Sequence, residues 1–172
     1  SWIDTGDVNA SPETISSPFL LTPPMNRIDP DKGQTLRISY PGGMGLPKDR
    51  ESLFWVNVLE IPPRAHDAVT PNHLQVAFRS RIKLFFRPAE LTGDAYHSAE
   101  SVRWTAQSNT LVAKNDSPYY VNLLGVHTTG ENHKILAEGD MIPPYSSITV
   151  KVKNGVALRP GEKLSYDFIN DW

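Results

Sequence analysis

The chain has 172 residues, of which 39% are hydrophobic and 21% charged, so it is long enough for one large or two small globular domains and too apolar for wholesale disorder. The net charge of −2 provides no overall field for nucleic acid or an anionic membrane, and the absence of cysteine excludes disulfides and thiolate metal sites. No apolar run approaches the roughly 18 residues of a membrane span, so we expect no membrane insertion. The opening residues Ser1–Asp4 form no signal peptide and lack an initiator Met, so a processed or trimmed product is expected.

Short strands joined by turns are expected along the whole chain, because 15 prolines disfavour long helices. The most helix-like segment, residues 49–61, carries apolar side chains on both of its alternating faces, with Asn57 as the one break. That pattern indicates a strand buried on both sides. The other expected strands are residues 18–22, 34–39, 73–87, 101–106, 110–114, 119–126, 133–137, 147–153 and 164–169.

A domain boundary is expected near residues 87–92, because the long strand 73–87 ends at Pro88 and a new series of strands follows. Domain 1 would span residues 1–87 and domain 2 residues 88–172. The second has enough strands for a seven-stranded immunoglobulin-like sandwich, whereas the first offers only about five. The first domain is therefore expected to lack N-terminal strands, and its exposed core and strand edge favour self-association.

Five segments of the chain carry specific motifs: residues 46–63, with the sequence LPKDRESLFWVNVLEIPP, and residues 22–24, 80–88, 117–120 and 169–172. They closely resemble segments of the periplasmic pilus chaperones of the PapD/FimC-like family, and they occur in the family's order. The resemblance implies an all-β protein with two immunoglobulin-like β-sandwich domains in an L-shaped or boomerang arrangement. It also implies strands upstream of Ser1 that complete the first domain and carry a cleft arginine.

Leu74, Val76 and Phe78 alternate with small or polar residues in the expected strand 73–87. Taken alone, this alternation is more typical of a strand with one face in the sandwich core. The resemblance instead implies that these side chains face outward on the family's G1 strand and fill the groove of a pilin subunit. Such donor-strand complementation is a form of β-augmentation.

Lys83 lies further along the same segment, among Arg79, Arg81 and Arg87. A solvated basic strand is one interpretation; a nucleic-acid stripe is less consistent, since stacking aromatics on one face are missing. The resemblance implies that Lys83 binds the C-terminal carboxylate of the pilin subunit, together with the arginine upstream of this chain. Charge-assisted hydrogen bonds are what a partly desolvated carboxylate requires.

The resemblance further implies that Glu51, Arg87 and Asp171 form an interdomain charge cluster, although three unrelated surface charges would fit the spacing equally well. Breaking a partly buried cluster of this kind would leave uncompensated charge. The loop of residues 64–72 is short and has no cysteine, like the subclass of these chaperones that serves rod-like adhesive pili.

No enzymatic or cofactor chemistry is predicted. The five histidines show no metal-ligand spacing, residues 42–45 form a glycine turn without a dinucleotide fingerprint, and no G-x-S-x-G motif is present. The resemblance implies a periplasmic chaperone of a Gram-negative bacterium that binds pilin subunits and delivers them to an outer-membrane usher. One alternative is an immunoglobulin-like pilin or adhesin, which would need a donor extension and usually cysteines. Another is a carbohydrate-binding or hydrolytic sandwich, which would need clustered aromatics or paired carboxylates. The sequence shows none of these features.

Overall fold

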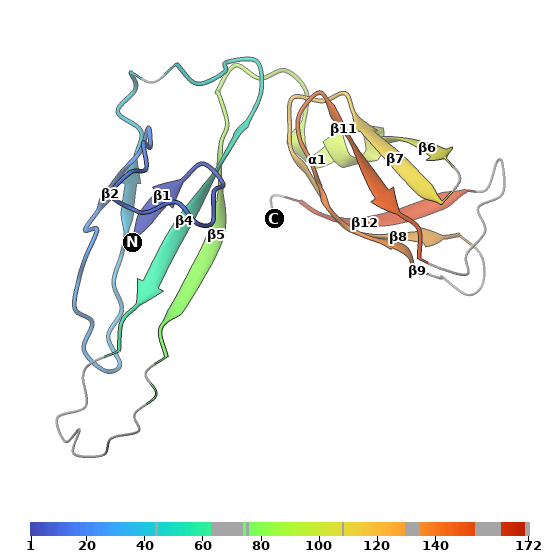
Figure 1. Cartoon of the computed structure of the whole chain (residues 1–172). Helices are drawn as coiled ribbons and strands as arrows, with labels where there is room; N and C mark the ends of the chain where they lie inside the picture. The colour runs from blue at the N-terminus through green and yellow to red at the C-terminus, as the bar shows by residue number, and fades with distance from the viewer. Residues whose placement is uncertain are drawn as a thin grey trace. The chain divides into compact units, whose positions relative to one another are not determined.

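The computed structural model describes residues 1–43, 45–62, 74, 76–107, 109–129, 135–153 and 163–170. The chain divides into two compact units, and the regular secondary structure of their described residues is almost all β-strand (Figure 1). Unit 1 comprises residues 1–46 and 52–86, and unit 2 comprises residues 47–51 and 87–172. In the described part of the chain, no helix is long and apolar enough to cross a bilayer.

Unit 1 is organised around the antiparallel sheet β1-β4-β5, formed by β1 (Trp2–Asp4), β4 (Ser52–Glu60) and β5 (Phe78–Phe86). A separate antiparallel pair, β2 (Leu20–Thr22) with β3 (Arg37–Ser39), lies between β1 and β4 in the sequence. Apolar residues of both groups form the core. Its members are Ile3, Phe54 and Val56, packed by Phe19, Leu21, Leu46, Val58, Leu84 and Phe86.

Strand β4 confirms the interpretation of residues 49–61 as a strand rather than a helix. Phe54 and Val56 are buried in the core, and Val58 packs against the same cluster from the same face. Asn57 points to the opposite face yet is fully buried, because polar partners described below cover it. The expected burial on both sides is met only in part, because Leu53 and Trp55 of the second face are half-buried and Leu59 is 41% exposed.

Unit 2 is a sandwich of two antiparallel sheets whose inner faces bury two apolar clusters, both packed by Trp104, Ile148 and Tyr166. One sheet has the order β11-β7-β6, and in the other β8 pairs with β9, β10 and β12. The strands are β6 (Arg103–Gln107), β7 (Thr110–Asn115), β8 (Val121–Thr128), β9 (Ile135–Glu138), β10 (Met141–Ile142), β11 (Ser146–Lys151) and β12 (Leu164–Ile169). Leu111 of β7, Val126 of β8 and Leu136 of β9 meet in the core.

Four elements were not predicted: β1, β10, the one-turn helix α1 (Ala95–Ser98) and the 3-10 turn η1 (Ala99–Ser101). Each has four residues or fewer, which is too short to show a period in the sequence. The start of α1 does carry a signal, because Asp94 accepts a hydrogen bond from the Tyr96 amide at 2.9 Å.

The predicted strand 73–87 was too long at its start, since β5 begins at Phe78 and the described residues Leu74, Val76 and Ala77 lie outside the ladder. The reason lies in the partner strand. Phe78 pairs with Glu60, the last residue of β4, and Pro62 follows two residues later. A proline cannot donate to a ladder, so β4 gives no template for the residues before Phe78.

Candidate functional site

Strand β5 forms an edge of its sheet among the described strands, because it pairs with β4 alone (Figure 1). An edge strand presents backbone N–H and C=O groups that can pair with another chain. Large apolar side chains are exposed along this edge and the residues before it. They are Leu74 (87% exposed), Val76 (51%), Phe78 (66%) and Ile82 (60%).

The two faces of β5 differ in chemistry. Phe78 and Ile82 share the face of Leu84 and Phe86, whose side chains reach the core of unit 1. Arg79, Arg81 and Lys83 lie on the opposite face, since side chains alternate along a strand. An apolar row and a basic row therefore run along one strand, and Lys83, five residues beyond Phe78, belongs to the basic row.

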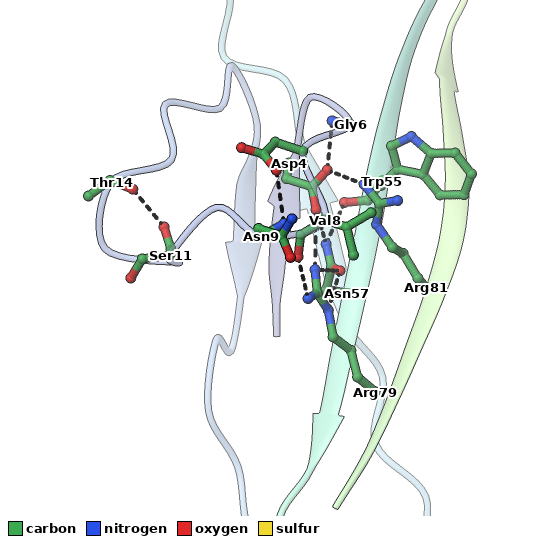
Figure 2. Close-up of polar contacts among 11 residues, drawn as sticks. Asp4, Gly6, Val8, Asn9, Ser11, Thr14, Trp55, Asn57, Arg79 and Arg81 are labelled. Atoms are coloured by element: carbon green, nitrogen blue, oxygen red, sulfur yellow. Dashed lines mark hydrogen bonds and ion pairs between the residues drawn. The ribbon is translucent and has the colours of Figure 1, made fainter.

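The basic row is organised by one buried carboxylate, that of Asp4 on β1, which is 1% exposed (Figure 2). Asp4 Oδ1 accepts hydrogen bonds from the Gly6 amide and from Arg81 Nη2, both at 2.7 Å. Its Oδ2 accepts from Asn57 Nδ2 at 2.7 Å, and Arg79 Nη2 lies 3.7 Å away. Arg79 in turn donates to Asn57 Oδ1 at 2.9 and 2.7 Å.

The charge state of Asp4 follows from these contacts. Burial alone would raise the pKa of this carboxyl, but the hydrogen bonds from Arg81, Asn57 and the Gly6 amide outweigh burial and hold the pKa below its ordinary value. Asp4 is therefore ionised at neutral pH and offsets part of the positive charge of the arginines.

Lys83 pairs across the ladder with Trp55 of β4, and its Nζ lies 5.9 Å from the centroid of the Trp55 ring. The Arg81 guanidinium carbon lies 4.3 Å from the same centroid. Both distances are within the range of cation–π attraction. The structure thus places Lys83 on the basic face of β5, beside an aromatic ring.

Glu51 and Arg87 come together in unit 2, although 35 residues of chain separate them. The buried Glu51 carboxylate accepts from Arg87 Nε and from the Tyr120 amide, each at 2.7 Å. The Glu51 amide donates to Pro118 O at 2.9 Å, and the Arg87 guanidinium carbon lies 5.1 Å from the Tyr119 ring centroid. Asp171, the third predicted member, and the loop 64–72 lie outside the described residues.

The turn of residues 115–120, whose Tyr120 amide binds Glu51, is held by the side chain of the buried Asn115. Asn115 Nδ2 donates to Tyr119 O at 2.7 Å, and its Oδ1 accepts from the Ser117 amide at 3.0 Å. A satisfied buried amide of this kind gives the turn one conformation. The Tyr120 amide is therefore already oriented to donate its hydrogen bond to the Glu51 carboxylate.

Replacing Glu51 by alanine is expected to lower the free energy of unfolding by about 2 kcal/mol, because Arg87 and the Tyr120 amide both lose their acceptor. The 42% exposure of Arg87 lets water recover part of the loss. Urea denaturation measures the change. The exposed Glu90 provides the control, and Glu90→Ala should cost less than about 0.5 kcal/mol. Equal losses for the two variants would contradict the role of Glu51.

Sequence reasoning did not identify Asp4, Trp55, Asn57 or Tyr120 as site residues. Asn57 carried the one available signal, since a lone amide in a strand buried on both faces requires a polar partner. The identity of that partner could not be found, because Asp4 lies 53 residues away in the sequence.

Both halves of the chain match models of one protein family. Residues 1–92 match "Pili and flagellar-assembly chaperone, PapD N-terminal domain", and residues 97–172 match "Pili assembly chaperone PapD, C-terminal domain". The chain belongs to the PapD family of pilus-assembly chaperones. This confirms the resemblance seen in the sequence, and with it two immunoglobulin-like domains in an all-β chain.

Individual relatives agree with the family assignment. The chain is 38% identical to the chaperone protein HifB of Haemophilus influenzae, covering 100% of itself and 70% of HifB. It is 39% identical to the probable fimbrial chaperone YadV of Escherichia coli K12, with 100% and 72% covered. PapD-family proteins are periplasmic chaperones rather than enzymes, so the prediction of a non-enzymatic protein is confirmed.

Solved structures of chaperones share the fold. The CupB2 chaperone of Pseudomonas aeruginosa aligns with a TM-score of 0.79 and 33% identity, over 99% of this chain and 77% of that one. SafB of Salmonella enterica, solved in complex with the SafA pilin, aligns with a TM-score of 0.79 and 28% identity, over 99% of this chain and 74% of the SafB chain.

Proposed function

We propose that this PapD-family chaperone acts in the periplasm and caps pilin subunits by donor-strand complementation, with β5 and the residues just before it as the donor. One observation carries the proposal: the edge strand β5 and the residues just before it expose apolar side chains at alternating positions, namely Leu74, Val76 and Phe78. The solved complex of the relative SafB with the SafA pilin supports a pilin as the partner.

The chemistry of the strand suits a subunit whose own sheet lacks an edge strand. The backbone of β5 would extend the subunit's ladder, and the apolar row would fill its open groove. Each apolar side chain that becomes fully buried would contribute about 1.5–3 kcal/mol. This capping would keep the exposed groove from aggregating.

Lys83 would set the register of the added strand by binding the subunit's C-terminal carboxylate. When similar apolar side chains repeat every two residues, a strand can pair in several registers. A charged anchor at one end would favour a single register. The carboxylate would approach the basic face of β5, while the groove closes over its apolar face.

Delivery to an outer-membrane usher would complete the cycle. The incoming subunit's N-terminal extension would displace β5 from the groove, which requires no nucleotide, metal or covalent step.

The apolar row is tested by the Phe78→Asp variant. A carboxylate carried into an apolar groove without a partner is costly, so affinity for a cognate pilin should fall at least about 100-fold. Loss of the equimolar complex in co-purification is the expected result. Leu124→Asp is the matched control, because Leu124 is similarly exposed (57%) but lies on β8 of unit 2. An equimolar complex formed by Phe78→Asp would rule out β5 as the donor.

A further inference from the structure

The indole of Trp55 is shared by two cations on the outer face of the sheet. The Arg81 guanidinium carbon lies 4.3 Å from the ring centroid, and Lys83 Nζ lies 5.9 Å from it. Trp55 and Lys83 are direct cross-strand partners, while Arg81 pairs with the neighbouring Asn57. Direct and diagonal neighbours in a sheet are both within reach of an aromatic side chain.

Arg81 is the fixed member of this group. Its Nη2 donates to the buried Asp4 at 2.7 Å, and its side chain is only 19% exposed (Figure 2). Asp4 therefore determines where the guanidinium lies, and the guanidinium covers part of the Trp55 ring. The ring is held in one orientation before any ligand arrives.

A ring holds a cation in a way that suits an anion-binding lysine. Cation–π attraction neither neutralises the ammonium charge nor uses one of its three N–H donors, as a carboxylate partner would. It also restricts a side chain with four rotatable bonds, so less freedom is lost when a ligand binds. Within the described ion pairs of this row, Asp4 supplies one negative charge against two from Arg79 and Arg81.

We propose that Trp55 is a positioning residue for Lys83: the indole, oriented by the Asp4–Arg81 pair, places the ammonium where a subunit's C-terminal carboxylate is bound. This inference rests on the proposed anchor role of Lys83. Trp55 acts through Lys83 and has no contact with the carboxylate of its own.

The test measures discrimination between a carboxylate and its neutral analogue. A synthetic peptide of alternating apolar residues is prepared with a free C-terminal carboxylate and, separately, with a C-terminal amide. Dissociation constants of both forms are measured with the full-length chaperone. Because the forms differ only at the terminus, their ratio reports the anchor and is insensitive to general loss of strand affinity.

Trp55→Leu is expected to reduce the amide-to-acid ratio by about threefold to tenfold, and Trp55→Phe to give an intermediate ratio, since phenylalanine is a weaker cation–π partner than tryptophan. Trp2→Leu is the matched control, because the Trp2 ring centroid lies 4.9 Å from the guanidinium carbon of Arg79, whereas the cross-strand partner of Lys83 is Trp55. It should keep the wild-type ratio.

The outcomes separate the two proposals. Wild-type ratios in the Trp55 variants, with a reduced ratio in Lys83→Ala, would overturn the role of Trp55 and leave the anchor intact. A wild-type ratio in Lys83→Ala would overturn the anchor and this inference together. If Trp55→Leu does not fold, Trp55→Phe decides: a reduced ratio supports the positioning role, and an unchanged ratio contradicts it.

Discussion

Lys83→Ala in the full-length protein is expected to abolish capture of a pilin subunit while leaving the chaperone folded. Lys83 lies on the exposed basic face of β5, so its removal opens no cavity in the core of unit 1. Its charge-assisted hydrogen bonds to a terminal carboxylate are each worth about 1.5–3 kcal/mol. Loss of this anchor also removes the feature that sets strand register, so misregistered complexes would dissociate.

Pull-down of a cognate pilin, followed by measurement of its dissociation constant, checks this prediction. Lys151→Ala is the matched control, because Lys151 is an exposed strand lysine in β11 of unit 2. Lys83→Arg should recover part of the binding, since it keeps the charge but places its donors in a planar fork. Undiminished pull-down by Lys83→Ala would exclude the anchor role.

Asp4→Ala is expected to cause the largest loss of stability, about 3–5 kcal/mol. Asp4 is 1% exposed, and its removal leaves Arg81, Asn57 Nδ2 and the Gly6 amide without their acceptor. It also removes the side-chain contacts of β1 with Asn57 of β4 and Arg81 of β5, although the backbone pairing of β1 with β4 remains. Asp7→Ala is the control, because Asp7 is exposed nearby and should cost less than about 1 kcal/mol. Similar losses for the two variants would show that the buried network has no special weight.

The same carboxylate makes stability depend on pH in one direction. The pKa of Asp4 is lower in the folded protein than the ordinary value, so its contribution is fully present above about pH 4 and is lost as pH falls through the folded-state value. Urea denaturation from pH 7 to pH 2 should show the wild type losing stability relative to Asp4→Asn in that acid range. If the difference in free energy of unfolding between the wild type and Asp4→Asn stayed constant over this pH range, a lowered pKa of Asp4 would be contradicted.

Local pattern was sufficient for most of the strands. The run around Phe54 and Val56 predicted β4, and alternation with regularly spaced turns predicted a sandwich of short strands. Elements that depend on distant partners were missed. Trp2–Asp4 forms β1 only because it pairs with residues 55–57, and β5 starts at Phe78 only because β4 ends at Glu60.

For the candidate site, the sequence indicated several residues but not the partners that they contact. The resemblance drew attention to Lys83, Glu51 and Arg87 and assigned Leu74, Val76 and Phe78 to the pilin groove, whereas the alternation of those three residues alone favoured a face in the core. The partners of these residues depend on strand register and on contacts between distant segments, and neither can be inferred from the local sequence. Trp55 meets Lys83 through cross-strand pairing, and Glu51 meets the Tyr120 amide across 69 residues of chain.

The structure of the full-length chaperone bound to a pilin subunit tests donor-strand capping most directly. A subunit strand is expected to pair along the edge of β5 opposite β4, with Leu74, Val76 and Phe78 in the subunit's groove and the subunit's C-terminal carboxylate at Lys83. A subunit bound elsewhere, with the edge of β5 open and these side chains still exposed to solvent, would contradict it.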